Sequence, residues 1–498
     1  MKKLLLLLFA QMLFLAVSAE NTVKINGIYY NLMNKFGNHS AEVTSGNDKY
    51  AGDVVIPAVV EYEGIKYEVV AIDKMAFAGS GDMSSVSIPN CVVTIQDHAF
   101  YECSGLKCFT FPDSITVIDD YLFEECTNLT EIHLPNSATR IGMGVFKNCS
   151  SLKSIVLPDG ITHIGNEAFS QCVGLQKIDL SKNLSSIGYI SFIGCPNLKD
   201  ITFPESLREI RKNAFDGCGG LASIVIPDGV NIGDYAFRNC QGLTSVSLPN
   251  SLTSVPCGLF QDCFNLTSIQ IPQSVTEIED FAFQNSGLRS IELPNILRII
   301  REGAFTNCAE LKEMDIPENV YYIGDDAFAN CKSLKTISIF SKRITIDTRS
   351  FGNCPNIENV YNWCQEVSNI KANSFANSSI GNATLHVLAN LYDDYKAHAC
   401  WGLFGKIVPL NGEPMNEEIV NGVANVRANP VIVQSNGNII TITGLTDNSL
   451  VSAYALDGTL IGYATANNGS ADIYMPEFNQ HGVVIVKLGD WSVKVRIK

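Results

Sequence analysis

The stretch Leu152–Cys172, LKSIVLPDGITHIGNEAFSQC, contains the pattern that decides the fold. It opens with Leu-x-x-Ile-x-Leu, whose alternation with period two predicts a short strand with one buried face. Pro158 then predicts the end of that strand, because proline has no N–H to donate to a ladder. Ile161 and Ile164 predict a second short extended segment, and the pair ending in Phe169 returns to the core. One such unit has nothing against which to bury its apolar face, so the pattern predicts stacked copies.

The same pattern recurs along most of the chain. A pair x-Phe, usually Ala-Phe, returns in steps of 22 to 24 residues, at Phe77, Phe100, Phe123, Phe146, Phe169, Phe192, Phe215, Phe237, Phe260, Phe283, Phe305, Phe328, Phe351 and Phe375. A fixed period of this length is the signature of a solenoid. We therefore predict a mainly β repeat solenoid of about 14 repeats of 23 residues over 73–383, followed by a small β-sandwich.

The repeat resembles the BspA-type bacterial leucine-rich repeat, and the resemblance covers about residues 70–380. It implies an N-terminal cap over 20–72 and a closing segment over 384–410, in which Trp401 and Phe404 cover the open end. A short helix is expected near the start of the closing segment. The resemblance also implies a surface protein that adheres to host or matrix proteins, or to other bacteria.

Cysteine occupies a fixed place in the repeat, three residues after the phenylalanine. Eleven of the 16 cysteines lie there, at Cys103, Cys126, Cys149, Cys172, Cys195, Cys218, Cys240, Cys263, Cys308, Cys331 and Cys354, and serine fills the place in three other repeats. This pattern predicts a buried structural ladder of thiols. Disulfides between stacked neighbours are an alternative, as is a bond between the off-ladder Cys364 and Cys400. No Cys-x-x-Cys occurs, which argues against a redox motif or a zinc knuckle.

The ends of the chain predict export. Residues 1–19 have a basic start, an apolar run and small residues before a cut at Glu20, as in a secretory signal peptide. A membrane anchor is the alternative, but the run is short for a ~30 Å hydrocarbon core. No later stretch is long and apolar enough to span a bilayer. We therefore expect an exported protein at the cell surface or outside the cell.

The C-terminal part predicts a linker over 411–425 and short alternating strands over 426–498, as in a small β-sandwich. Its motifs resemble the C-terminal sorting domain of the type IX secretion system. The resemblance implies passage across the outer membrane with the secretion machinery as a partner. An ordinary accessory domain that stays attached is the alternative.

Composition and motifs exclude several classes of function. The 498 residues carry 35 Lys and Arg against 51 Asp and Glu, a net charge of −16, which argues against nucleic-acid binding. We find no nucleophile elbow, no His-Glu-x-x-His and no phosphate-binding loop, so we predict no enzyme, no cofactor and no metal. The paired acids Asp119–Asp120 and Asp325–Asp326 are interpreted as solvated turns.

The repeated strand offers an extended face for a protein or glycan ligand. Its outward positions are mostly small, polar or acidic, and few are aromatic. The candidate binding face comprises Glu131, His133, Lys177, Asp179, Asp200, Gln270, Glu292, Glu313 and Asp315, with Tyr321 and Tyr322 as its aromatic members. We predict a macromolecule-binding surface protein, most simply an adhesin. A carbohydrate-binding protein and a structural envelope component are the alternatives, and Tyr392, Tyr395 and Trp401 form the one possible sugar platform.

Overall fold

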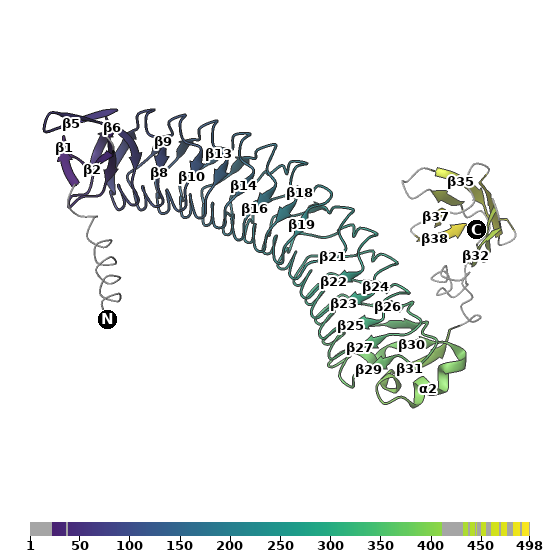
Figure 1. Ribbon diagram of the computed structural model, residues 1–498. Helices are drawn as coiled ribbons and strands as arrows, with labels where there is room; N and C mark the ends of the chain where they lie inside the picture. Colours follow the sequence, from purple (N-terminus) through teal and green to yellow (C-terminus); the bar gives the residue numbers. More distant parts are fainter. Residues whose placement is uncertain are drawn as a thin grey trace, which may run out of the picture. The chain divides into compact units, whose positions relative to one another are not determined.

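The computed structural model describes residues 22–35, 38–410, 432–436, 439–443, 445, 450–454, 460–467, 470–475, 482–488 and 491–497. The predicted signal peptide and linker lie outside these residues. The chain divides into two compact units: one extends to Leu385 and includes Asp394–Ile407, and the other holds His386–Asp393 and the residues from Val408 onward. The first unit is a β-solenoid of about 15 turns with little helix, which confirms the predicted fold class (Figure 1).

Each turn of the solenoid follows one plan, illustrated by the turn that begins at Leu152. A three-residue strand, β13 (Ser154–Val156), is followed by Pro158, whose carbonyl accepts the N–H of Ile161 at 3.0 Å. The two-residue strand β14 (His163–Ile164) comes next, and the chain then turns to place Phe169 in the core. The proline thus ends one strand and closes the bend that leads to the other.

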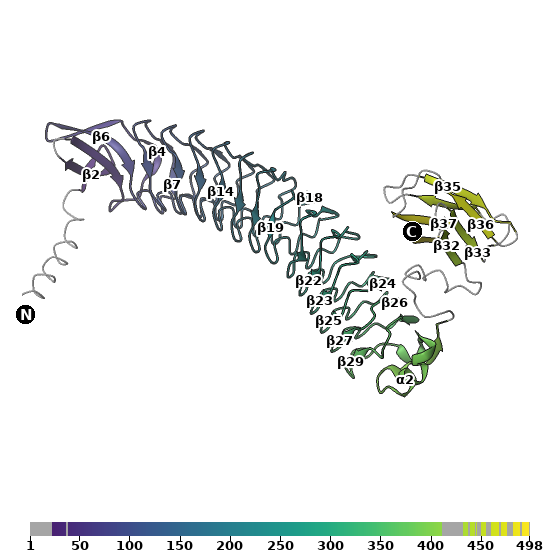
Figure 2. The same cartoon turned by 45° about the vertical axis from the view of Figure 1, so that its right-hand side comes forward.

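The two-residue strands of successive turns stack in parallel, with partners 22 to 24 residues apart, and we call this array the short-strand sheet (Figure 2). Its members are β8 (Thr94–Ile95), β10 (Val117–Ile118), β12 (Arg140–Ile141), β14, β16 (Ser186–Ile187), β17 (Glu209–Ile210), β19 (Asn231–Ile232), β21 (Ser254–Val255), β22 (Glu277–Ile278), β23 (Ile299–Ile300), β25 (Tyr322–Ile323), β27 (Thr345–Ile346) and β29 (Asn369–Ile370).

The strands that precede the proline form the second array, the long-strand sheet. Its members are β9 (Cys108–Thr110), β11 (Glu131–His133), β13, β15 (Lys177–Asp179), β18 (Ser223–Val225), β20 (Ser245–Ser247), β24 (Glu313–Ile316), β26 (Thr336–Ile339) and β28 (Asn359–Asn362). They also pair in parallel. Isolated bridges at Lys177–Asp200 and Gln270–Glu292 continue the pairing where regular strands lapse.

The solenoid interior is a stack of aromatic rings. The fourteen repeat phenylalanines are buried, and each stacks on the next with ring centroids 5.0 to 6.3 Å apart. Isoleucine and leucine from the two strands fill the space around the stack. Because each ring stacks on the rings of the neighbouring turns, the core is continuous along the solenoid.

Every turn but the last contains two residues with left-handed backbone, two positions before and two after the repeat phenylalanine, and the last turn has only the second of them, Asn377. Asn, Gly and Asp fill most of the second position, as their tolerance of positive φ predicts. At the first position, Tyr121 is followed one turn later by Gly144, where a Cβ atom would approach the tyrosine ring to 2.3 Å. A bulky ring therefore requires glycine in the next turn.

The N-terminal segment converts antiparallel pairing into the parallel stack. The strands β1 (Thr22–Ile25), β2 (Ile28–Lys35) and β3 (Asn38–Thr44) form a meander, and β3 pairs in parallel with β6 (Ile65–Ile72), which also pairs with β5 (Val59–Tyr62). β6 pairs in parallel with β8, whereas β4 (Ala51–Val55) pairs in parallel with β7 (Asp82–Ser87). Pairing in the N-terminal segment thus changes from antiparallel in β1–β3 to parallel between β6 and β8 and between β4 and β7.

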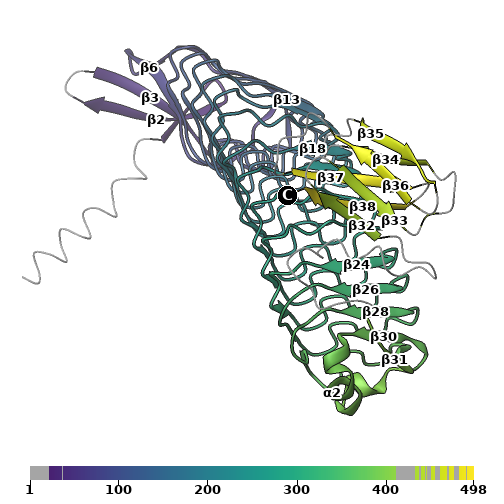
Figure 3. The same ribbon diagram turned by 90° about the vertical axis from the view of Figure 1, so that its right-hand side faces the viewer.

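The C-terminal segment of the solenoid covers the last phenylalanine. It comprises η1 (Ile380–Asn382), β30 (Thr384–Val387), η2 (Ala389–Leu391), α2 (Tyr392–Ala397), η3 (Trp401–Leu403) and β31 (Lys406–Pro409). β30 and β31 extend the sheet of β24, β26 and β28 (Figure 3). Trp401 is fully buried, lies 5.7 Å from the ring of Phe375 and donates from Nε1 to Ser368 O at 3.1 Å.

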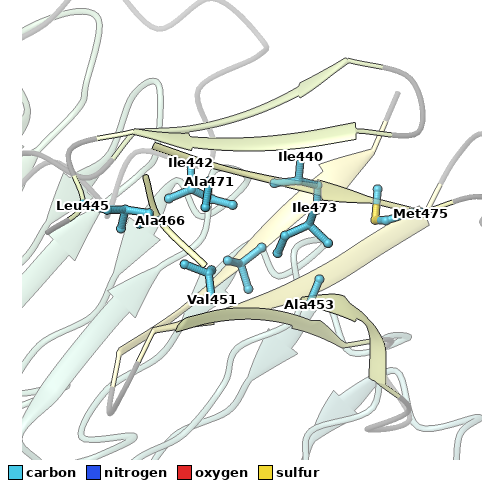
Figure 4. Close-up of a cluster of buried hydrophobic side chains, with 10 residues drawn as sticks. Ile440, Ile442, Leu445, Val451, Ala453, Ala466, Ala471, Ile473 and Met475 are labelled. Atoms are coloured by element: carbon cyan, nitrogen blue, oxygen red, sulfur yellow. The ribbon is translucent and has the colours of Figure 1, made fainter. Parts of the chain in front are cut away.

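The second unit contains a two-sheet sandwich, as predicted. One sheet holds β32 (Ile432–Asn436), β33 (Ile439–Thr443) and β36 (Ser470–Tyr474), and the other holds β35 (Leu460–Thr465), β34 (Leu450–Tyr454), β37 (Gly482–Leu488) and β38 (Trp491–Ile497). Alternate residues of both sheets, among them Ile440, Ile442, Val451 and Ile473, form its core (Figure 4).

Candidate binding surfaces of the solenoid

Nine of the predicted face residues lie on the long-strand sheet or at its bridges. Strand register places their side chains outward, because the residue between them points into the core: Ile132 between Glu131 and His133, and Met314 between Glu313 and Asp315. All nine are exposed except Asp179, which is half-buried. We call these nine residues the polar strip.

The charges of the polar strip differ between its two ends. His133 Nε2 lies 2.9 Å from Glu131 Oε1, and Lys177 pairs with Asp179, so both acids of the N-terminal turns have a side-chain partner within the strip. At the other end, Glu313 and Asp315 are both acidic. Although Asp315 is exposed overall, desolvation of its carboxyl group raises its pKa, an effect to which Glu313 adds. The strip therefore ends in a concentration of negative charge.

The remaining two predicted residues belong to the other sheet, and their assignment to this face is corrected. Tyr322 begins β25, in register with β23 and β27 of the short-strand sheet, and Tyr321 directly precedes that strand. Tyr321 is 53% exposed, and the hydroxyl of Tyr322 donates to Asp347 Oδ2 at 3.1 Å. Both tyrosines follow Pro317, whereas the residues of the long-strand sheet precede the proline position of their repeat, and this explains why the tyrosines lie on the other sheet.

Sequence reasoning missed an aromatic cluster at the acidic end of the strip. Phe340 and Trp363 stack with centroids 4.7 Å apart, and Tyr361 lies 5.7 Å from Trp363. Tyr361 pairs with Ser338 in the register of the sheet, both side chains are buried, and burial raises the pKa of Tyr361. The sequence contains a signal for this cluster. Phe340 and Trp363 stand at the place in their repeats that Pro317 has in its own, where most repeats have proline.

The short-strand sheet carries a shallow trough of about 340 Å³, lined by residues of five successive turns. Its lining includes Asp120, Arg140, His163, Asn166, Ser186 and Arg211. Two ion pairs lie at its ends, Arg140 with Asp120 and Arg211 with Glu209. None of these residues belongs to the predicted face.

The cysteine ladder is a hydrogen-bonded structural element. Each of its eleven thiols lies 3.0 to 3.3 Å from the carbonyl oxygen of the repeat phenylalanine in the preceding turn, and Ser378 makes the same contact with Phe351 O at 2.6 Å. Burial raises the pKa of Cys195 to about 12. A thiol that stays protonated at neutral pH is a poor nucleophile and metal ligand.

Two of the alternatives raised by the sequence do not fit the structure. All sixteen cysteines are free thiols, including Cys364 and Cys400, so neither that bond nor a bond between neighbouring turns is present. Tyr395 and Trp401 are fully buried against the end of the core, so they do not form a sugar platform with Tyr392. The need to cover the last turn explains their burial.

The paired acids have structural partners in neighbouring turns. Asp120 accepts the N–H of Met143 as well as the Arg140 guanidinium, and Asp326 pairs with Arg349. Within the described ranges, no group of three or more His, Cys, Asp or Glu side chains is placed to hold a metal ion. The same ranges contain no helix long and apolar enough to cross a membrane.

Comparison with known proteins identifies the repeat. The family model for the BspA type leucine-rich repeat region matches residues 70–195, 162–289 and 253–382, which together are more than half of the chain. The chain belongs to this family. BspA-type proteins have leucine-rich repeats, and such families are generally non-enzymatic scaffolds that bind other macromolecules.

Solved structures are similar to this BspA-type chain. A leucine-rich repeat protein from Bacteroides ovatus is 29% identical, with a TM-score of 0.68 over 78% of this chain and 100% of the other. A leucine-rich cell surface protein from Faecalibacterium prausnitzii is 25% identical, with a TM-score of 0.41 over 65% of this chain and 96% of the other. No curated protein matches the chain.

Proposed function

We propose that this protein is an exported adhesin that binds host or matrix proteins, or other bacteria, through its polar strip. The observation that carries the proposal is the parallel register of the long-strand sheet, which repeats the same outward positions from turn to turn. Such a face is long and shallow, and it suits an extended macromolecule that makes many contacts. Small molecules prefer concave, mostly apolar pockets.

The C-terminal end of the strip supplies the charges that select a partner in this proposal. Glu313 and Asp315 are exposed on one strand, β24, which pairs with β26. Acidic residues on an interface select a partner surface of complementary positive charge. We therefore expect a partner surface with exposed Lys or Arg.

Binding of the purified protein to a panel of matrix proteins at physiological salt tests this proposal. We expect saturable binding to at least one protein, weakened about tenfold by Glu313→Gln with Asp315→Asn, since interface charge pairs are worth about 1.5 kcal/mol or more. Glu302→Gln, an exposed acid in the turn after β23, is the matched control. Loss of binding with Tyr321→Ala but not with the double variant would move the interface to the short-strand sheet. Self-association without any partner would favour the envelope component.

Export is the second part of the proposal, and it rests on residues 1–19 and on the C-terminal sandwich. The first segment has the pattern of a signal peptide, and the last domain resembles a type IX sorting domain. Fractionation of the producing bacterium tests both. Deletion of 1–19 should keep the protein in the cytoplasm, whereas deletion of 426–498 should leave it in the periplasm. Surface display of the second variant would contradict the sorting role.

A further inference from the structure

We propose that the trough on the short-strand sheet binds an oligosaccharide that carries carboxylate or sulfate groups. The trough is separate from the polar strip, so the inference goes beyond the proposed adhesin function and does not depend on it. It rests on the lining residues, on how the arginines are held, and on the contrast with the later turns.

The two arginines are held in place by carboxylates that are themselves satisfied. Arg140 Nη2 lies 3.1 Å from Asp120 Oδ1, which also accepts the N–H of Met143 at 2.8 Å. Arg211 Nε donates to Glu209 Oε2 at 3.0 Å, and the hydroxyl of Ser186 donates to the same oxygen at 3.1 Å. These contacts fix the guanidinium groups before any ligand arrives.

Most of the donors of the two arginines remain available. A guanidinium has five N–H groups, and each of these ion pairs uses one nitrogen. The side chains of Arg140 and Arg211 are 56% and 51% exposed, respectively. Arginine binds carboxylate, phosphate and related oxyanions through paired N–H donors. The two groups therefore define two points at which an anionic ligand is recognised.

Polar side chains line the space between the two arginines, namely His163, Asn166 and Ser186. In the register of the sheet, Arg140, His163 and Ser186 succeed one another from turn to turn, and Arg211 follows in the next turn. His163 lies within hydrogen-bond distance of the Thr162 hydroxyl, and Asn166 borders the trough. At ~4.8 Å per strand, the turns of Arg140 and Arg211 lie about 14 Å apart. That span suits a chain of several sugar units with a charge near each end.

The lining favours a sugar over an acidic peptide. Hydroxyl, amide and imidazole groups match the hydroxyls of a sugar, and only Met143 and Ile164 contribute apolar side chains. Peptides are generally anchored by side chains in apolar pockets. The lining also departs from the acidic character of the chain, since it holds two arginines and one acid, Asp120.

Later turns of the same sheet lack this arrangement and supply a control. Arg301 has the repeat position of Arg211 and pairs with Glu277, and its side chain is 48% exposed. The positions of Gly165 and Gly188, which border the trough, are filled there by Pro256 and Glu279. Arg301→Ala therefore removes an equivalent exposed ion pair without altering the trough.

The test measures binding of the full protein to immobilised oligosaccharides in 50 mM and 150 mM salt. The probes are hyaluronate, which has carboxylates only, keratan sulfate, which has sulfates only, heparin fragments, which have both, and chitohexaose, which is uncharged. We expect saturable, salt-sensitive binding to at least one charged probe and none to chitohexaose. Hyaluronate and keratan sulfate show which anion is recognised.

Variants assign the binding to the trough. Arg140→Ala and Arg211→Ala should each weaken binding about tenfold to a hundredfold, the range for charged hydrogen bonds. Arg301→Ala should change it less than about twofold, and the polar-strip double variant should not change it. Thermal melting checks that each variant folds. Equal loss in all three arginine variants, equal binding of chitohexaose, or no binding up to about 1 mM overturns the proposal. Tighter binding of a poly-glutamate peptide to the same arginines overturns the sugar assignment.

Discussion

The interior and the surface of the solenoid follow opposite rules. Inside, every turn presents the same phenylalanine, and most present the same thiol, in the same geometry. Outside, the position occupied by His163 in one turn is Arg140 in the turn before and Ser186 in the turn after. The comparison teaches that repetition builds the fold, whereas departures from repetition make one part of the surface chemically different from another.

Alkaline pH should produce the largest effect on the interior. Burial raises the pKa of Cys195 and Cys263 to about 12 from 9.0. Unfolded thiols lose their protons above pH 9 while folded thiols keep them, so stability is full below pH 9 and falls as pH rises toward 12. Each ladder thiol should lower the free energy of unfolding by about 1 kcal/mol as the pH rises from 9 to 10. Urea unfolding at pH 8, 9 and 10 under reducing conditions measures this.

A variant of the ladder provides the control for the pH effect. Replacing Cys103, Cys195 and Cys263 with Ser removes three ionisable groups, so the slope of stability against pH should become shallower. Serine is compatible with the position, because Ser378 makes the same contact. Equal stability of the parent protein at pH 8 and pH 10 would contradict the buried ladder.

Truncation of one ring in the stack should have the next largest effect. Phe215 lies 5.0 Å from Phe192 and 5.4 Å from Phe237, and it is fully buried. Phe215→Ala should lower the free energy of unfolding by about 3–5 kcal/mol, because it opens a cavity between two rings. Val225→Ala, at a 68% exposed site, should change it by less than about 0.5 kcal/mol. Similar losses in both would remove the distinction between interior and surface.

A single thiol should contribute less than a ring. Cys195 Sγ donates to Phe169 O at 3.1 Å. Cys195→Ala should cost about 1–2 kcal/mol, because it leaves a buried carbonyl with one contact fewer and a small void. Cys195→Ser should cost less, since its hydroxyl keeps the donor. Urea unfolding at pH 7 measures both variants. A larger loss of unfolding free energy for Ser than for Ala would show that this position needs an apolar side chain more than it needs a hydrogen-bond donor.

A surface ion pair should have the smallest effect. Lys335 Nζ lies 2.7 Å from Glu358 Oε1, and the two side chains are 57% and 58% exposed. Lys335→Ala should change the free energy of unfolding by less than about 0.5 kcal/mol, because solvent screens the pair. The change should shrink further in 1 M salt. A loss above about 1 kcal/mol that persists in high salt would show that this side chain supports the fold through packing.

The interior was more predictable than the binding surfaces. The period of Phe and Cys predicts both the stack of phenylalanine rings and the cysteine ladder. Equal spacing in a parallel stack forces equivalent residues into contact. The polar strip was predictable for the same reason, from its place beside Ile132 and Met314. The aromatic cluster of Phe340, Tyr361 and Trp363 was missed, although a comparison of the proline positions would have found it.

Other features needed the structure because they depend on contacts between different parts of the repeat. Tyr321 follows the proline and therefore belongs to the short-strand sheet, not to the polar strip. Arg140 reaches Asp120 from the following turn, and the trough is formed by five turns together. No single repeat contains that site.

The sequence by itself determined the solenoid, its length in turns and its buried ladders, because apolar residues at a fixed period can be buried only by stacking. Tertiary structure alone decided which exposed residues meet. Side chains on neighbouring turns are about 23 residues apart in the chain, and their contacts depend on direction and reach as well as on spacing. The free thiols of Cys364 and Cys400, the buried Trp401 and the paired arginines of the trough all follow from that three-dimensional placement.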